Sequence, residues 1–446
     1  MKVTQLKLLI SVIFVVAGLT LGVYYVQIPS STGEGVMTLD FGNYEIKTMS
    51  VDGEINANEA LINMCGELGY DIDFDVDGSV IGINGLPEAG DSRVWGVYTL
   101  NSSYNWVKYT DDSSTLTIKE GDKISWALRN ENERPTPCVD STGTSFYGWK
   151  TATRIVCLAP SCTETVCALG GEDLIVGVDM YSNYPTSIIQ KKDAGLIAET
   201  GTYTTPNFET IVELEPDLVI GIASQFNHVK TVEKLREVGV NGIVVSDGED
   251  LQSVYDNTYM TGVAMGYTDA AKTITMELKE QVEQTYTYIS ATSGRPTVMT
   301  ALSSDKAPWV AGTSTYVSDC YSKSGASNAF QGTVDGWKQI SAEEVVKINP
   351  SIIIVISQLE ADESNYESMM ANLSEEWKST TAYKEGKIYM VSGMSEDLFS
   401  RPSTRLAQLT EILGRMFHED VFPDKITVPM YYSDNYTDYL TYSKEL

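Results

Sequence analysis

The chain has 446 residues, which is too long for one hydrophobic core and indicates two or three folded modules. It carries 31 Lys and Arg against 61 Asp and Glu, a formal net charge of −30. Such an acidic surface repels nucleic acids, so DNA and RNA binding are excluded. The charge would keep the protein soluble in a salty exterior or attract it to a basic partner surface.

The chain begins with an uncharged apolar run, residues 8–26, that follows Lys2 and Lys7. As a helix this run would be about 28 Å long, close to the hydrocarbon thickness of a bilayer. Lysines before it and acids after it place its N-terminus inside the cell. We therefore expect residues 1–30 to be a signal anchor in the cell membrane, with the soluble bulk extracytoplasmic. A cleaved secretory signal is the alternative, and it gives the same location.

Residues 37–135 predict a small β-rich module. Short segments of strand-like composition are separated by turn residues, and residues 56–70 predict one amphipathic helix that ends before Gly69. The apolar side of this helix would carry Leu61, Ile62, Cys65 and Leu68. Strands, one helix and further strands predict a small α+β, β-grasp-like fold. The polar, proline-bearing residues 130–143 then predict a linker.

From Arg154 onward the sequence alternates apolar strands with helices, which predicts a parallel sheet. We assign a first lobe to residues 152–248. Residues 249–292 contain no proline and predict one long connecting helix. The alternation resumes in a second lobe at residues 293–420, followed by a C-terminal tail at 421–446. The predicted fold class is α/β, with two Rossmann-like lobes joined by one long helix.

Three cysteines, Cys157, Cys162 and Cys167, lie close together where the first strand passes into the first helix. They lack the tight CxxC pairs of zinc sites, so no metal site is predicted. Ser161 and Glu164 match a capping box, which would start the helix at about Cys162. We expect Cys157 and Cys167 to be core residues. Cys162, at the carboxyl end of a parallel strand, would face a ligand cleft with a lowered thiol pKa.

Two segments of the chain repeat each other without gaps: NFETIVELEPDLVIGIAS and SAEEVVKINPSIIIVISQ. Each has a glutamate seven residues before a proline, Glu209 before Pro216 and Glu343 before Pro350. In both, the proline would end a helix before an apolar strand. The repeat supports two lobes of the same construction, with one matched glutamate in each.

From residue 152 to about 420 the chain resembles the extracytoplasmic solute-binding proteins of cobalamin and iron-siderophore ABC importers. The resemblance lies in RIVCLAPSCTETVCALG, NFETIVELEPDLVIG, WKQISAEEVVKINPSIIIV and DLFSRPSTRL. It implies two lobes that trap ligand between their edges, with only a small hinge motion. It also implies an ABC permease and ATPase complex as partner, with Glu209 and Glu343 docking on permease arginines.

The same resemblance implies which residues contact the ligand. The aromatic candidates are Tyr181, Tyr203, Trp309 and Trp337. Tyr203 stands where the cobalamin binders have tryptophan, which keeps a flat ring but loses area. Asp397 and Arg401, in DLFSR, match positions that hydrogen-bond the side amides of a corrin ring. A large apolar ring with polar edges needs a lining of this kind.

Residues 57–128 resemble the small domain at the C-terminus of transcobalamin and intrinsic factor, which covers one face of cobalamin. The resemblance lies in ANEALINMCGELGY, WGVYTLN and LTIKEGDKISWAL. Ser102 replaces the glycine of that family's Asn-Gly turn. Two corrinoid-associated domains in one chain favour a corrinoid over a siderophore as the transported ligand.

Other classes of function find less support in the sequence. The chain has only two histidines, His228 and His418, and no HExxH, GxSxG or Walker A motif, so we expect neither an enzyme nor a bound cofactor. The first alternative is a ferric-siderophore or haem binding protein of the same fold, with Arg401 and Arg405 as anion contacts. The second is a cell-surface adhesion protein that uses the first module.

Overall fold

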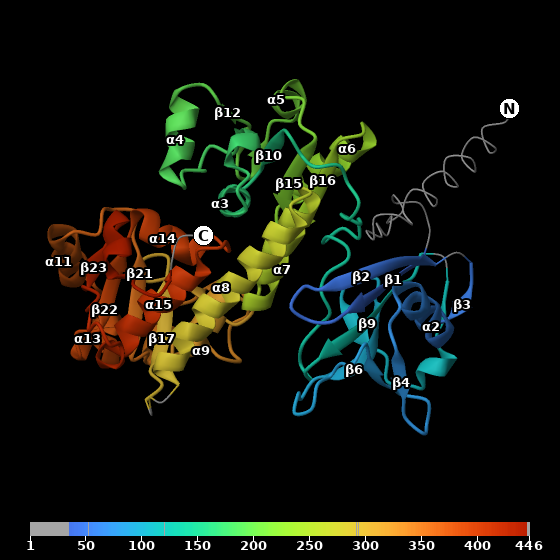
Figure 1. The fold of residues 1–446 in the computed structure, drawn as a ribbon. Helices are drawn as coiled ribbons and strands as arrows, with labels where there is room; N and C mark the ends of the chain where they lie inside the picture. The colour runs from blue at the N-terminus through green and yellow to red at the C-terminus, as the bar shows by residue number, and fades with distance from the viewer. Residues whose placement is uncertain (1–34, 52, 120, 291, 293, 444–446) are drawn as a thin grey trace. The chain divides into compact units, whose positions relative to one another are not determined.

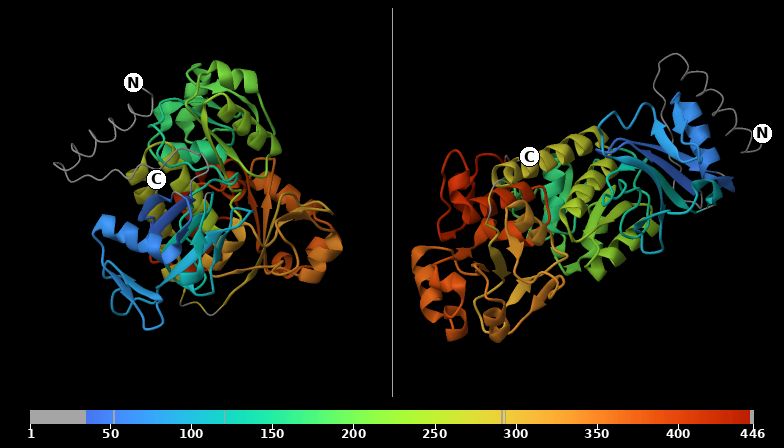
Figure 2. Two further views of the ribbon diagram at one scale, coloured as in Figure 1. Left: turned by 90° about the vertical axis from the view of Figure 1, so that its right-hand side faces the viewer. Right: turned by 90° about the horizontal axis from the view of Figure 1, so that it is seen from below.

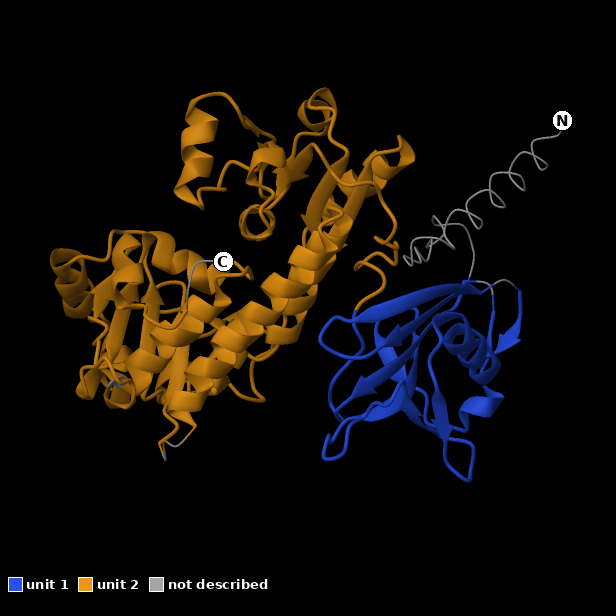
Figure 3. Ribbon diagram, in the orientation of Figure 1, with its two compact units in different colours: residues 1–136 blue, residues 137–446 orange. Residues whose placement is uncertain are grey.

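The computed structural model describes residues 35–443, except for residues 52, 120, 291 and 293. The chain divides into two compact units, residues 1–136 and residues 137–446 (Figure 3). In the described part of the chain, no helix is long and apolar enough to cross a membrane. The anchor predicted at residues 1–30 lies outside the described residues.

The first unit is built on a five-stranded mixed sheet of order β2–β1–β9–β6–β7. Strands β1 and β9 run parallel at its centre, and each has an antiparallel neighbour on its outer side. The elements are β1 (Gly35–Asp40), β2 (Ile46–Val51), β3 (Ile55–Asn56), α2 (Ala57–Leu68), β4 (Ile72–Phe74), β5 (Val80–Ile83), β6 (Val94–Leu100), β7 (Trp106–Lys108), β8 (Thr117–Ile118) and β9 (Lys123–Arg129). Two further pairs, β3 with β8 and β4 with β5, complete the unit.

Helix α2 forms where the sequence predicts it, because both of its ends are capped. The side chain of Asn56 accepts hydrogen bonds from the first-turn amides, and Gly69 ends the helix with a φ of 72°. Leu61 and Cys65 are buried in the core of the unit. Ile62 is 50% exposed, so the expectation that it shares the buried side is wrong. It lies one residue after Leu61, a rotation of about 100° around the helix.

The first lobe of the second unit is a sheet of five strands in the order β12–β11–β10–β15–β16. All four neighbouring pairs are parallel, as the alternation of strands and helices predicts. The strands are β10 (Ile155–Cys157), β11 (Ile175–Val178), β12 (Ala198–Glu199), β15 (Leu218–Ile222) and β16 (Asn241–Val245). The helices are α3 (Pro160–Ala168), α4 (Thr186–Asp193), α5 (Phe208–Glu213) and α6 (Phe226–Glu237), and a hairpin joins β13 (Gly201–Thr202) to β14 (Thr205–Pro206). Side chains of α5 and α6 pack against the sheet in one apolar core.

The lobe begins before residue 152, because part of the predicted linker is bound to its sheet. The carboxylate of Asp140 is fully buried; it pairs with Arg236 at 2.5 Å and accepts the amide of Val244 in β16 at 2.8 Å. The Ser141 amide donates to the Val244 carbonyl. The boundary at residue 152 is therefore too late. A polar composition suggested a linker, but the buried aspartate makes this segment part of the lobe.

The single connecting helix expected at residues 249–292 is wrong, since two helices occupy this stretch. Helices α7 (Leu251–Ala264) and α8 (Thr268–Ile289) are separated at Gly266, which has a φ of +79° that an α-helix cannot contain. The two helices pack side by side (Figures 1 and 2). Helix α7 contacts α3 and β16 of the first lobe, and α8 contacts α9 and α15 of the second.

The second lobe is a mixed sheet of order β20–β18–β17–β21–β22–β23, with β19 beside β17. Its strands are β17 (Thr297–Ala301), β18 (Trp309–Ala311), β19 (Ser327–Asn328), β20 (Trp337–Gln339), β21 (Ile352–Ile356), β22 (Ile388–Val391) and β23 (Tyr431–Tyr432). Its helices are α9 (Tyr316–Lys323), α10 (Ala342–Ile348), α11 (Glu363–Asn372), α12 (Glu375–Lys378), α13 (Thr381–Lys384), α14 (Gly393–Ser400) and α15 (Leu406–Phe417). The β17–β21–β22 pairs are parallel, which gives this lobe the same α/β construction as the first.

The C-terminal segment expected as a separate tail is part of the second lobe. Strand β23 pairs in parallel with β22. Glu411, fully buried in α15, forms an ion pair with Arg415 at 2.7 Å. Its two carboxylate oxygens also accept the backbone amides of Thr441, Tyr442 and Ser443. These bonds tie the end of the described chain to the core of the lobe.

Candidate ligand-binding site

The first strand of the first lobe ends at Cys157, and α3 begins three residues later. The helix starts at Pro160, with Ala159 at the N-cap and no side-chain cap. The predicted capping box of Ser161 and Glu164 is therefore wrong. Proline at the first helical position needs no hydrogen-bond partner for its nitrogen, which explains the earlier start. Glu164 is consequently available for contacts elsewhere.

The three cysteines near this helix differ in burial. Among the described residues, no group of three or more His, Cys, Asp and Glu side chains is arranged to hold a metal ion. Cys157 is fully buried, as predicted for a core strand, and Cys167 is half-buried.

Cys162 is only 3% exposed, and burial raises the pKa of its thiol to about 12. The expected lowering of this pKa is wrong, because removal from water outweighs the helix N-terminus. Cys162 lines a small cavity with Ser161 and Thr165 of α3, Val245 and Ser246 at the end of β16, Asn257 and Thr261 of α7, and Pro402. The space inside holds about one water molecule. A corrin ring cannot enter it.

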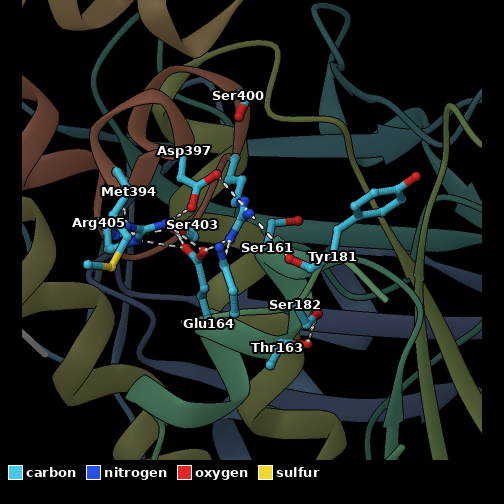
Figure 4. Close-up of polar contacts among 12 residues, drawn as sticks. Ser161, Thr163, Glu164, Tyr181, Ser182, Met394, Asp397, Ser400, Ser403 and Arg405 are labelled. Atoms are coloured by element: carbon cyan, nitrogen blue, oxygen red, sulfur yellow. Dashed lines mark hydrogen bonds and ion pairs between the residues drawn. The ribbon is translucent and has the colours of Figure 1, made fainter. Parts of the chain in front are cut away.

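The predicted polar contacts Asp397 and Arg401 pair with each other in an ion cluster that joins the two lobes. Figure 4 shows Glu164, Asp397 and Arg405 of this cluster. Asp397, in the last turn of α14, pairs through Oδ1 with Arg401 at 2.7 Å. Arg401 also donates to Glu164 of α3 at 3.0 Å and to Asn183 at 2.6 Å, both in the first lobe. Arg405 pairs with Glu164 at 2.6 Å. We call Glu164, Asp397, Arg401 and Arg405 the interlobe ion cluster.

Burial raises the pKa of both carboxyl groups and the two arginines lower it, but the balance differs between Asp397 and Glu164. Burial raises the pKa of Asp397 to about 6, and Arg401 and Arg405 only partly oppose it. Burial also acts on Glu164, but Arg405 and Arg401 outweigh it and hold the pKa of Glu164 below its usual value. At neutral pH both carboxylates are therefore ionised, and two negative charges face two guanidinium groups.

The four aromatic candidates lie in three places. Tyr181 follows β11 and is 54% exposed, with its ring directed away from Glu164 (Figure 4). Tyr203, in the β13–β14 hairpin, is half-buried with its ring edge-on to His228, 5.6 Å between centroids. Trp309 and Trp337 lie on β18 and β20, which pair antiparallel with Ala311 opposite Trp337. Residues 309, 311 and 337 therefore share one face of this ladder, so the two indoles are diagonal neighbours.

The glutamates of the repeated segments occupy equivalent positions. Glu209 is the second residue of α5, whose N-cap is Asn207, and Glu343 is the second residue of α10, whose N-cap is Ser341. Both side chains are exposed. In the described part of the chain, neither makes an ion pair. Two equivalent carboxylates, one on each lobe, are thus open to a partner.

Sequence reasoning does not find several residues of the site. The local pattern assigns Glu164 to a helix cap, and no motif singles out Asn183, Tyr184 or Ser403. The ring of Tyr184 lies 4.2 Å from the guanidinium of Arg405, and Ser403 donates to Glu164 at 2.5 Å. The partners of these residues lie more than 200 positions away in the chain, so no local sequence pattern predicts these contacts.

Two α/β lobes joined by a helical pair, with polar groups where they meet, form a fold that other proteins share. The profile of the periplasmic binding protein family matches residues 155–392, which is more than half of the chain. The chain belongs to the periplasmic binding protein family. The matched region includes Glu164, Glu209 and Glu343 and covers most of the two lobes, and it ends just before Asp397, Arg401 and Arg405.

This periplasmic binding protein is similar to two relatives and one solved structure whose names describe a binding role. It is 27% identical over 307 residues to an uncharacterized ABC transporter substrate-binding lipoprotein, YvrC, of Bacillus subtilis, covering 68% of this chain and 91% of the relative. It is 25% identical over 268 residues to a cobalamin-binding protein of Halobacterium salinarum, covering 59% of this chain and 69% of the relative. A solved structure from Staphylococcus epidermidis, described as a possible iron-binding (periplasmic solute-binding) protein, matches with a TM-score of 0.51 and 27% identity. That match covers 60% of this chain and all of the other.

Proposed function

We propose that this protein is the extracytoplasmic substrate-binding component of an ABC importer and that it captures cobalamin or a related corrinoid between its two lobes. The names of two relatives support the transport role and the ligand class, since one is an ABC transporter substrate-binding lipoprotein and the other a cobalamin-binding protein. The apolar run at residues 8–26 would hold the protein at the membrane.

The observation that carries the choice of ligand is the charge balance of the interlobe ion cluster. An anionic siderophore or the propionates of haem would need arginines with unsatisfied charge. Arg405 is 4% exposed and is already paired with Glu164, and Arg401 pairs with Asp397 and Glu164. Because the two carboxylates neutralise the two guanidinium groups, the cluster offers polar groups but no net positive charge. Such a site suits the neutral side amides of a corrin ring.

Asp397 adds an acceptor for such amides. Its Oδ2 atom is buried and accepts no hydrogen bond within the described residues, and the Nη2 atom of Arg405 lies 3.9 Å from it. A buried carboxylate oxygen without a donor is costly unless a ligand supplies one. An amide N–H of the ligand would satisfy it.

The aromatic residues support a flat, mostly apolar ligand. Tyr181 and Trp309 are about half exposed, at 54% and 48%. Exposed aromatic rings gain buried area when a ring system stacks on them. Together with Tyr203 and Trp337 they would cover the faces of a corrin, while Asp397 and Arg401 hold its edge.

An iron-containing ligand is the second candidate, supported by the Staphylococcus epidermidis structure described as a possible iron-binding protein. Tyrosine ligates ferric iron as phenolate. Burial raises the pKa of the Tyr203 phenol, which opposes the phenolate in the ligand-free protein. This effect and the paired arginines make the corrinoid the better proposal.

Titration of the full chain with cobalamin tests the proposal, with haemin and a ferric hydroxamate siderophore as comparison ligands. We expect saturable binding of cobalamin with a Kd below about 10 µM and much weaker binding of the other two. Saturable binding of haemin or ferric siderophore without binding of cobalamin would replace the ligand assignment. If none of the three ligands binds, the proposed capture of a corrinoid or of an iron-containing ligand is contradicted.

The first unit supports the same ligand class only through its resemblance to the small domain of transcobalamin. Its mixed sheet with one helix is compatible with the predicted β-grasp-like fold. We propose that it is a second corrinoid-associated domain. The permease and ATPase complex would be recognised by the second unit through Glu209 and Glu343.

A further inference from the structure

Glu164 connects the two lobes through several hydrogen bonds. Its Oε1 accepts from Arg401 at 3.0 Å and from Arg405 at 2.6 Å. Its Oε2 accepts from the Nε of Arg405 at 3.0 Å and from the Ser403 hydroxyl at 2.5 Å. Glu164 belongs to α3 of the first lobe, whereas all three partners follow α14 in the second. One side chain thus receives four hydrogen bonds across the lobe boundary (Figure 4).

The burial of Glu164 makes these contacts obligatory. Its side chain is 1% exposed, so water cannot replace a lost donor. A buried carboxylate is stable only when its charge is balanced and its oxygens are hydrogen-bonded. If the lobes separated at this point, Glu164 would lose both of its arginine partners, and Arg405 would keep only the counter-charge of Asp397, whose Oδ2 atom lies 3.9 Å away. The closed contact is therefore strongly preferred to a partly opened one.

The two arginines held by Glu164 have different surroundings. Arg405 is enclosed: its guanidinium lies over the Tyr184 ring and donates to the Met394 carbonyl. Arg401 is half-buried, and its second amino group faces Asp397 and the Tyr181 carbonyl. Arg405 thus holds the two lobes together. Arg401 links Glu164 to Asp397, whose Oδ2 atom has no hydrogen-bond donor among the described residues.

We propose that Glu164 is a positioning residue of the ligand site: it fixes the angle between the lobes and orients Arg401 and Asp397 toward the ligand without touching the ligand itself. This inference rests on the proposed function for the identity of the ligand. The fixed lobe angle is a property of the ligand-free protein, and it can be measured separately.

The test measures the separation of the lobes by double electron–electron resonance, with nitroxide labels at Glu209→Cys and Glu343→Cys. Both positions are exposed, one in each lobe. The native cysteines of the described chain are buried or half-buried, so labelling selects the introduced ones. The full chain is compared with two variants, Glu164→Gln and Glu411→Gln. Glu411 is the matched control because it is also fully buried and paired with an arginine, but its partners all lie in the second lobe.

We expect a narrow distance distribution in the parent and in Glu411→Gln, and a broader one in Glu164→Gln. Cobalamin titrations of the unlabelled proteins should show a loss of affinity of about tenfold or more in Glu164→Gln alone. An unchanged distance distribution in Glu164→Gln would overturn the proposal. A broadened distribution with unchanged affinity would also overturn it, since the lobe angle would then not position the ligand contacts.

The experiment also distinguishes two further outcomes, failure of the parent to bind cobalamin and failure of the Glu164→Gln variant to fold. If the parent does not bind cobalamin, the proposed function fails, whereas the distance comparison still decides whether Glu164 fixes the lobes. If Glu164→Gln does not fold, Ser403→Ala replaces it, because this change removes one hydrogen bond and leaves both charges in place. A smaller broadening and a smaller loss of affinity are then expected, and the absence of both would contradict the proposal.

Discussion

At the residue scale, Asp397 shows how burial and ion pairing compete at one carboxyl group. Its pKa is raised from 3.8 to about 6 because burial outweighs Arg401 and Arg405. Since the pKa is higher in the folded than in the unfolded chain, the neutral acid stabilises the fold. This contribution is fully present below pH 3.8 and is lost as the pH rises through about 6. At neutral pH the protein keeps an ionised Asp397 at the expense of stability.

Replacement of this residue, Asp397→Asn, should therefore stabilise the ligand-free protein at about pH 7.5, by up to about 3 kcal/mol, because the buried charge is removed. Near pH 4 the gain should vanish, since Asp397 is then neutral in the parent as well. Urea unfolding at the two pH values measures the difference.

The same variant should bind cobalamin more weakly, because the carboxylate acceptor is lost. Such an exchange of stability for binding is common at functional sites. A variant that is less stable than the parent at pH 7.5 would show that the ion pair with Arg401 outweighs burial.

At the scale of elements, the turn between α7 and α8 decides how the two lobes are connected. The amide of Tyr267 bonds to the Gly262 carbonyl and the amide of Gly266 to the Val263 carbonyl, which closes α7. Gly266 has a positive φ and lies against Thr151. Helix α8 packs on the second lobe, whereas α7 contacts α3 and β16 of the first lobe and α9 of the second, so a packed pair of helices joins the lobes.

Substitution of Gly266 by alanine should destabilise the protein by about 1–3 kcal/mol, since the backbone conformation disfavours a Cβ atom. The added Cβ would also lie 2.8 Å from the Cα of Thr151. Thermal unfolding of Gly266→Ala measures the loss. Gly294→Ala is the control, because its Cβ meets nothing within 4 Å, and its stability should change by less than about 0.5 kcal/mol. Equal effects of the two changes would contradict the argument.

Comparison of particular elements shows what the sequence can predict. The longer apolar strands of both lobes, such as β15 and β21, and helices such as α6 and α15 follow from apolar periodicity, which is a local property. The short strands β12, β18, β19, β20 and β23 carry no such pattern. The break at Gly266 also has a local signal, because glycine followed by Tyr267, Thr268 and Asp269 is typical of one helix ending and another beginning.

Glu164 is different. Its local pattern with Ser161 fits a helix cap, while its true partners, Arg401 and Arg405, lie 237 and 241 positions away. Charge pairs of this kind depend on how the lobes meet, and no local rule encodes that. Equivalent positions in a repeat are easier to find, since the two repeated segments align Glu209 with Glu343 directly.

At the scale of the whole molecule, the two lobes of the second unit present one equivalent exposed glutamate each. A transporter that recognises both carboxylates at once would recognise the spacing and orientation of the two lobes. The net charge of −30 adds long-range attraction to a basic docking surface.

The double variant Glu209→Ala with Glu343→Ala should bind cobalamin as tightly as the parent but should lose uptake in cells that express the cognate permease. The matched control is Glu213→Ala with Glu367→Ala, which also removes one exposed glutamate from each lobe. Uptake measured with labelled cobalamin should remain near the parent level in the control. Persistent uptake in the first double variant would show that docking uses other residues.

The contact between Glu411 and the backbone amides of residues 441–443 also bears on how the chain is made. These amides and the Ser443 hydroxyl are donors to a carboxylate that lies in the core of the second lobe. During synthesis they emerge some thirty positions after Glu411, so the lobe cannot complete its core until residue 443 is available. A chain that stopped shortly before residue 443 would bury the Glu411 carboxylate without these hydrogen-bond donors, and proteases would degrade it early. Residues 441–443 thus couple completion of the core of the second lobe to their own synthesis.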